Sequence, residues 1–167
     1  DTNTFTHILH QKNDSHSLAG NNVYDIIEDK EGYLWFACFM DGLSCIPVDK
    51  IENPIFINYK HDPNKMQSLC DNSVRALCAD QDGGLWIGMQ NAGLDFLKED
   101  KKSIIHYEND PGDPMSLNNN NIYRLYQDKA GDLWIGTSSG LSKYNPECDC
   151  LYQYPSIIKD DTLTMIR

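Results

Sequence analysis

The sequence predicts an all-β chain, a β-propeller segment of about three four-stranded blades. Three stretches superpose column by column, and Trp35, Trp86 and Trp134 fall in one column about 50 residues apart, a period typical of a propeller blade. Each stretch also breaks into short apolar, β-branched runs separated by turn residues, which is the pattern of strands and not of amphipathic helices. Helical repeats of similar length are therefore excluded.

The first two strands of each unit are predicted to form a hairpin around an Asp-x-x-Gly turn. Aspartate at the first position and glycine at the last position fit a type I turn. The three turns span residues 29–32, 80–83 and 128–131. The first strands are expected over residues 23–28, 74–79 and 122–127. The second strands are expected over residues 34–37, 85–88 and 133–137.

A glycine-containing turn follows each second strand and leads into a third strand, and a fourth strand ends the unit. The third strands are expected to begin at Leu43, Leu94 and Leu141. The fourth strands are expected over residues 55–59, 104–107 and 151–154. Polar loops rich in Asn, Asp and Pro then carry the chain onward, over residues 60–72 and 108–120. The blades are accordingly expected at approximately residues 21–59, 72–107 and 120–154.

The repeat is defined by a turn aspartate, a turn glycine, a tryptophan and a second glycine in every unit. These positions are Asp29, Gly32, Trp35, Gly42, Asp80, Gly83, Trp86, Gly93, Asp128, Gly131, Trp134 and Gly140. One unit cannot bury both faces of its sheet, so blades must stack on their neighbours. We expect the tryptophans to be equivalent, mostly buried fillers between blades and not ligand-stacking platforms.

The N-terminal segment from Phe5 to Leu9 matches a fourth strand, but the three strands that would precede it are missing. We expect it to be the outermost strand of a preceding blade, which in closed propellers completes the ring. Residues 1–167 are therefore expected to be a partial propeller. Its ring would be completed by the remaining blades of the same polypeptide or by another copy of the chain.

Composition and charge restrict the function. The formal charge of −11 without any Lys/Arg cluster disfavours a nucleic-acid partner. No run approaches the roughly 18 apolar residues of a membrane helix, so this segment is expected to make no direct membrane contact. Paired carboxylates do not recur at a common position, and the sequence around Ser138 lacks a nucleophile elbow. We expect no catalytic residues in this segment and no cofactor.

Five of the six cysteines fall into two groups. Cys38, Cys45 and Cys78 align with apolar columns and are expected to be unpaired, buried thiols that pack as small hydrophobes. Cys148 and Cys150 lie in an exposed turn without a packing role. They are either a reactive pair of thiols or an oxidised pair, and the sequence does not decide between the two. The five histidines have no close spacing to one another or to a cysteine, so no metal site is expected.

The face most suited to a ligand follows from propeller topology. The loops between blades and the turns between second and third strands share one face around the central channel. Asparagines gather where these loops enter the first strands: Asn21, Asn22, Asn72, Asn120 and Asn121. Because each amide offers a donor and an acceptor, these side chains suit sugar hydroxyls. The alternative is that the asparagines only shape the turn into each first strand.

The column Asn-x-[Val/Ile]-x5-Asp-x-x-Gly-x-Leu-Trp, followed by Gly-Leu, resembles the two-component regulator propeller repeat. Asp128 to Thr137 and the stretch from Asp110 to Leu117 are especially similar, whereas the first copy departs from the pattern at Phe36, Ala37 and Cys38. The resemblance covers residues 5–154. It implies the periplasmic sensor region of hybrid two-component systems of Bacteroidetes, in which seven-bladed propellers precede an immunoglobulin-like domain, a membrane helix and a histidine kinase.

Three functions follow as hypotheses. The resemblance implies a periplasmic, glycan-sensing segment whose parent protein is a membrane-anchored homodimer with an oligosaccharide ligand and kinase chemistry elsewhere. The same repeat would serve equally in a structural or protein-binding propeller of an envelope or secretion assembly. A propeller lyase is the third hypothesis, and it would require His, Tyr or carboxylates clustered near the axis.

Overall fold

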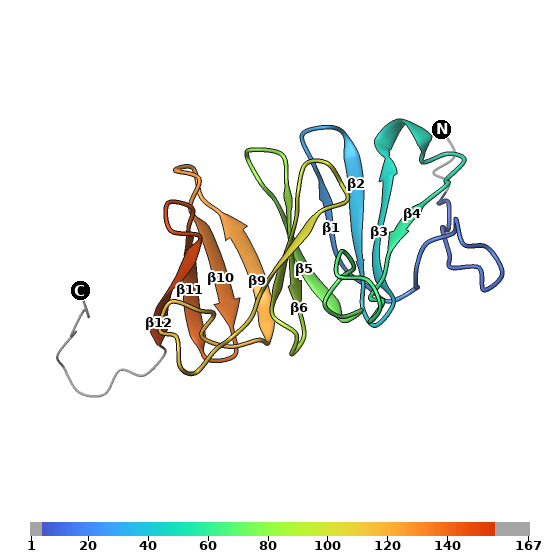
Figure 1. Cartoon of the computed structure of the whole chain (residues 1–167). Helices are drawn as coiled ribbons and strands as arrows, with labels where there is room; N and C mark the ends of the chain where they lie inside the picture. The colour runs from blue at the N-terminus through green and yellow to red at the C-terminus, as the bar shows by residue number, and fades with distance from the viewer. Residues whose placement is uncertain (1–4, 156–167) are drawn as a thin grey trace.

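The computed structural model describes residues 5–155 and contains three four-stranded antiparallel sheets, arranged side by side in chain order (Figure 1). Each sheet is a simple meander, so every strand pairs with its sequence neighbour. Blade 1 contains β1 (Val23–Glu28), β2 (Tyr33–Cys38), β3 (Gly42–Pro47) and β4 (Ile57–Tyr59), with the 3-10 turn η1 (Val48–Lys50). Blade 2 contains β5 (Val74–Ala79), β6 (Leu85–Met89), β7 (Leu94–Leu97) and β8 (Ile104–Tyr107). Blade 3 contains β9 (Ile122–Gln127), β10 (Leu133–Thr137), β11 (Gly140–Asn145) and β12 (Cys150–Pro155).

The predicted all-β propeller architecture is confirmed, and the first strands have the expected bounds in all three blades. The largest difference in bounds is in blade 1, where β4 begins at Ile57 and not at residue 55. The N–H of Phe56 instead donates to the carbonyl of His16 in the preceding loop (2.8 Å). The start of this segment therefore pairs with the loop, and only its end pairs with β3.

The hairpin turn between the first two strands is the predicted type I turn. In blade 1 the N–H of Gly32 donates to the carbonyl of Asp29 at 3.0 Å, and Gly32 has a φ of +79°. Glycine is favoured there because residues with a Cβ rarely adopt positive φ. The same bond and a positive φ recur at Gly83 and Gly131.

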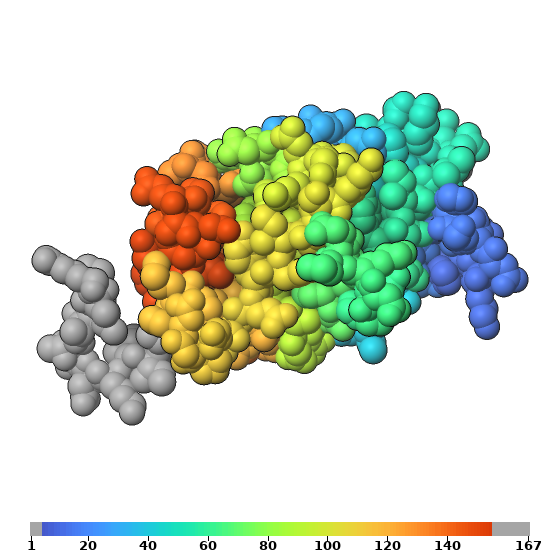
Figure 2. Space-filling view, viewed as in Figure 1, coloured from blue at the N-terminus to red at the C-terminus, as the bar shows by residue number. Residues whose placement is uncertain are grey.

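The first strands lie on the inner side of the blades. β5 lies against β1 on one side and against β9 on the other, so the three first strands form one continuous inner layer. In the space-filling view, the segments that follow β4 (green) and β8 (yellow) lie across the face toward the viewer (Figure 2). Among the described residues, no helix is long and apolar enough to cross a membrane.

The core consists of layers between blades. The tryptophan face of blade 1, with Trp35, Leu43 and Cys45, packs on Leu85 and Ile87 of blade 2. The tryptophan face of blade 2 packs on blade 3 in the same way. Trp35 and Trp86 are 1% and 2% exposed, but Trp134 is only half-buried. Equivalent burial of all three tryptophans was expected, and it fails at Trp134 because no following blade covers that face among residues 5–155.

The segment expected as an outermost strand, Phe5 to Leu9, forms no strand in the structure. Ile8 packs against the free face of blade 1, beside Leu18, Ile46 and Phe56. The strands that would pair with this segment are not in the chain, so its place in a preceding blade stays a prediction.

Candidate functional site

Three equivalent junctions lie at one end of the inner layer. At each, the loop entering the first strand bonds to the turn between the second and third strands. The bonds run from Phe39 N to Asn22 O (2.9 Å), from Gln90 N to Ser73 O (3.0 Å) and from Ser138 N to Asn121 O (3.0 Å). We call the surface formed by these junctions and by the next exposed residue of each first strand the axial rim. It consists of Asn22, Tyr24, Phe39, Ser73, Arg75, Gln90, Asn121, Tyr123 and Ser138.

The axial rim carries aromatic rings, a cation and amides. The rings of Tyr24 and Phe39 stack with their centroids 4.7 Å apart. The guanidinium of Arg75 lies 4.5 Å from the ring centroid of Tyr123, a cation–π distance. Tyr24 and Tyr123 are 46% and 43% exposed, so both rings keep a solvent-facing side. Apolar ring faces next to a few polar groups are the usual composition of a small-molecule site.

The five asparagines expected as ligand contacts divide into two sets. Asn21, Asn72 and Asn120 each accept, through Oδ1, a backbone N–H eleven residues earlier in the chain, at 2.7, 2.9 and 2.6 Å. These amides close the loops between blades. Asn22 and Asn121 lie on the axial rim, where Oδ1 of Asn121 faces Nη1 of Arg75 at 3.5 Å.

The strongest rim features were missed by the sequence reasoning. Tyr24, Arg75 and Tyr123 occupy one column of the repeat, three positions after Asn21, Asn72 and Asn120. The three positions do not share one residue type, so they do not stand out as an identity between the units. A search for exposed, chemically complementary residues in one column of the inner strands would have found them.

A concavity of about 500 Å³ lies away from the axial rim, along the loop after β4, and is lined by Asn58, His61, Gln67 and Leu69 among others. Several of its polar groups already have partners in the loop. Oε1 of Gln67 accepts the N–H of Ile104 at 2.8 Å, and Nδ1 of His61 contacts the carbonyl of Leu69 at 2.7 Å. These side chains hold the crossing between blades, so we consider the axial rim the better candidate.

Blade 2 contains a cluster of ionisable side chains, the Cys70–Asp95–His106 cluster, whose ligand atoms all lie within 4.8 Å of one another. Asp95 is fully buried, and its Oδ1 lies 2.6 Å from Nδ1 of His106. Burial raises the pKa of the Asp95 carboxyl. Burial lowers the pKa of His106, but the hydrogen bond and the charge of Asp95 outweigh this and raise it overall. Sequence spacing did not reveal this cluster, because its members come from a loop and two different strands.

The remaining cysteines behave largely as expected. Cys38 and Cys45 are buried and free, and burial raises the pKa of the Cys45 thiol to about 12. Cys78 is free but only half-buried, so the expectation of full burial is wrong for this residue. Cys78 packs at the margin of the core between blades 2 and 3.

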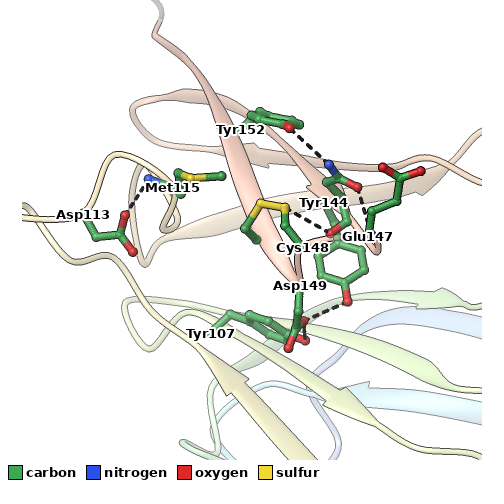
Figure 3. The surroundings of a disulfide bond; sticks show 10 residues. Tyr107, Asp113, Met115, Tyr144, Glu147, Cys148, Asp149 and Tyr152 are labelled. Atoms are coloured by element: carbon green, nitrogen blue, oxygen red, sulfur yellow. Dashed lines mark hydrogen bonds between the residues drawn. A yellow bond between two sulfur atoms is a disulfide. The ribbon is translucent and has the colours of Figure 1, made fainter.

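Cys148 and Cys150 are joined in a disulfide in the turn between β11 and β12. Asp149 lies between them, and Figure 3 shows the rings of Tyr107 and Tyr144 turned toward its carboxylate. The hydroxyls of Tyr107 and Tyr144 donate to Oδ1 of Asp149 at 2.6 and 2.9 Å. Because Tyr107 belongs to blade 2, this turn links two blades.

Comparison with solved structures supports the propeller assignment. The extracellular domain of the hybrid two-component system BT3049 of B. thetaiotaomicron is 27% identical with a TM-score of 0.71, over 81% of this chain and 19% of that one. The corresponding domain of BT4673 from the same organism is 21% identical with a TM-score of 0.66, over 86% and 20%. PorZ, a surface component of the type-IX secretion system of Porphyromonas gingivalis, is 25% identical with a TM-score of 0.55, over 71% and 17%.

This chain therefore spans about a fifth of each of these solved structures. No curated protein sequence is significantly similar to it. The family model of the two-component regulator propeller matches residues 17–40, 68–91 and 116–139, one match in each of the three units. Each match runs from the loop before the first strand to the turn after the second strand, and so includes the axial rim and the Asp-x-x-Gly hairpin. The chain therefore contains three two-component regulator propeller repeats.

Proposed function

We propose that this chain is a ligand-sensing propeller segment of a hybrid two-component signalling protein, that it binds a glycan or oligosaccharide, and that binding regulates use of that glycan. The segment is extracytoplasmic in this proposal, like the extracellular domains it resembles. It forms part of a larger propeller completed by further blades of the same polypeptide, within a membrane-anchored homodimer. Its role is binding, and the kinase chemistry belongs to other parts of the parent protein.

The observation that carries the proposal is the composition of the axial rim. Stacked Tyr24 and Phe39 offer an apolar platform, and Tyr123 with Arg75 offers a second one with a charge attached. Sugar rings have apolar C–H faces and a periphery of hydroxyls, so they pair with aromatic faces and with amide or guanidinium donors. Asn22 and Asn121 supply amides at the same surface. The rim thus combines both kinds of contact within one inner surface.

The test is calorimetric titration of the full-length protein with a panel of oligosaccharides, followed by variants of the rim. We expect Arg75→Ala or Tyr123→Ala to weaken binding by about tenfold or more, the loss of roughly 1.4 kcal/mol of interaction. Lys129→Ala is the matched control, because Lys129 is an exposed cation in the turn at the opposite end of β9. Equal affinity in the Arg75→Ala, Tyr123→Ala and Lys129→Ala proteins would place the ligand elsewhere.

A second candidate function is protein binding in a surface assembly, and the similarity to PorZ favours it. The same rim would then contact a protein, since exposed tyrosine and arginine are typical of protein interfaces. Absence of any oligosaccharide binding, together with a protein partner whose affinity falls in the Arg75→Ala variant, would support this function over the first.

A further inference from the structure

The Cys70–Asp95–His106 cluster occupies positions that also exist in the other two blades. In each blade a third-strand side chain accepts the N–H of a loop residue: Ser44 from Ala19, Asp95 from Cys70 and Ser142 from Asn118. A fourth-strand side chain lies opposite in register, and in each blade it contacts a loop carbonyl. These residues are Asn58, His106 and Gln153.

Blades 1 and 3 make these contacts with neutral groups. Ser44 and Asn58 are 2.6 Å apart in blade 1 and need no charge to satisfy the loop. Hydrogen bonding alone therefore does not explain a carboxylate, an imidazole and a thiol at the same three positions of blade 2. Asp95 is fully buried, and a buried carboxylate is costly unless it is paired or coordinates a cation; here the imidazole of His106 is its partner at 2.6 Å.

We propose that Cys70, Asp95 and His106 form a zinc-binding site, with Sγ, Oδ1 and Nδ1 as its three protein ligands. One thiolate, one carboxylate and one imidazole are each established Zn²⁺ ligands. Ligand atoms around tetrahedral Zn²⁺ are about 3.5 Å apart, given bond lengths of about 2.0–2.3 Å. One ligand atom from each of the three residues already lies within 4.8 Å of the other two, so side-chain adjustments of about 1 Å suffice.

The groups around the ligands are arranged as in a metal site. Nε2 of His106 faces the carbonyl of Met66 at 3.3 Å, so its N–H is held there while Nδ1 points at the cluster. Oδ2 of Asp95 accepts the N–H of Cys70 at 3.0 Å, which leaves Oδ1 for the cation. Such outer contacts orient metal ligands and fix the histidine tautomer. The cation replaces the proton between Oδ1 of Asp95 and Nδ1 of His106.

Two further atoms close to Cys70 are candidates for the fourth ligand of the zinc ion. Sγ of Cys70 lies 3.0 Å from Sδ of Met89 and 3.1 Å from the carbonyl oxygen of Ala92. The imidazole of His106 is 34% exposed, so the site is open to solvent from the outer edge of the blade. Zn²⁺ binding releases the thiol proton of Cys70 and the proton shared by the other two ligands, and it leaves a neutral site.

The experiment uses the reduced full chain after treatment with a chelator, with Co²⁺ as a spectroscopic substitute for Zn²⁺. We expect one equivalent of Co²⁺ to give a thiolate-to-metal charge-transfer absorption that Zn²⁺ abolishes. The variant C70A/D95S/H106N installs the neutral residues of blade 1, and we expect it to lose Zn²⁺ affinity by more than about 100-fold. Cys78→Ala, which removes a free thiol elsewhere in the same sheet, is expected to retain the absorption.

Circular dichroism checks that the triple variant is folded, and His106→Asn alone serves if it is not. Loss of the absorption in the folded variant, with retention in Cys78→Ala, supports the site. No absorption in the unmodified chain, or absorption that persists in the folded variant, overturns it.

Discussion

The indole N–H of Trp35 donates to Oδ2 of Asp29 at 2.7 Å, across the turn that joins β1 to β2. The other oxygen of this carboxylate, Oδ1, accepts the backbone N–H groups of Glu31 and Tyr33. The pairs Asp80–Trp86 (3.3 Å) and Asp128–Trp134 (2.9 Å) repeat the indole contact. One aspartate in each blade therefore fixes both the hairpin turn and the orientation of the tryptophan that fills the space between blades.

We predict that Asp29→Ala destabilises the chain more than Asp128→Ala. The first substitution leaves a fully buried indole N–H unpaired and removes one of the two carboxylate partners of Lys101 Nζ (3.4 Å), so we expect a loss of about 1–3 kcal/mol. Trp134 is half-buried, and water can replace the carboxylate of Asp128. Urea unfolding of the full chain measures the difference. If the two variants lost the same unfolding free energy, the hydrogen bond from the buried Trp35 indole to Asp29 would contribute no more to stability than the bond from the half-buried Trp134 to Asp128.

Trp86→Ala is expected to cost about 3–5 kcal/mol in unfolding free energy, and Trp134→Ala clearly less. Trp86 contacts Phe96 of its own blade and Tyr144 of blade 3, with ring centroids at 4.3 and 4.8 Å. Trp134 has one aromatic neighbour among the described residues, Tyr154 at 6.0 Å. Chemical denaturation monitored by circular dichroism tests the order, and a larger loss for Trp134→Ala would contradict it.

Reduction of the Cys148–Cys150 disulfide is expected to weaken the link between blades 2 and 3. The disulfide holds the turn in which Asp149 accepts the hydroxyl of Tyr107 (2.6 Å). Tyr107→Phe removes that bond at a cost of about 1 kcal/mol, and reduction should then have a smaller additional effect than in the unmodified chain.

The matched control for this pair is Tyr59→Phe, because the hydroxyl of Tyr59 donates to the carbonyl of Lys101 in the corresponding turn of blade 2 (3.1 Å), which has no disulfide. Reduction should destabilise the Tyr59→Phe variant as much as the unmodified chain. Additive effects of reduction and Tyr107→Phe would mean that the disulfide and the hydroxyl act independently.

The turn from Asp100 to Ser103 should contribute a pH dependence at low pH. The hydrogen bonds from the Ser103 hydroxyl and from the N–H groups of Ser103 and Lys102 lower the pKa of the Asp100 carboxyl to about 2, from an ordinary value of 3.8. A pKa below the unfolded value stabilises the fold above about pH 4, and the contribution is lost as pH falls through about 2. Ser103→Ala should move the pKa of Asp100 back toward 3.8, as followed by NMR titration. The lowered pKa of Asp128, which depends on Trp134, is the internal control and should not change.

The fold could be predicted well from the sequence because each backbone requirement of the blade occurs three times, once in each unit. Gly93, for example, is required because its φ is +84° and a Cβ there would lie 2.4 Å from the carbonyl oxygen of Tyr107. A constraint on the backbone of this kind appears as an identity in the column. Strand positions follow from such identities together with apolar alternation.

The axial rim and the Cys70–Asp95–His106 cluster were not predictable in the same way. Both consist of residues that differ from blade to blade at equivalent positions, as Arg75 differs from Tyr24 and Tyr123. The spatial neighbours of such residues depend on which blade lies beside them. The spacing of residues along the chain does not reveal these neighbours. The half-burial of Trp134 has the same origin, because its exposure depends on the adjoining blade and not on its own unit.

The contact between successive blades is directional, since the tryptophan face of one blade meets the opposite face of the next. The described blades consequently leave two complementary faces uncovered. One is the tryptophan face of blade 3, at Trp134, and the other is the opposite face of blade 1, at Leu34 and Phe36. Head-to-tail contacts of this type either close into a ring or continue as an open polymer. In the proposed propeller, further blades of the same polypeptide cover both faces. The segment of three blades on its own should instead associate head to tail, to an extent that rises with its concentration.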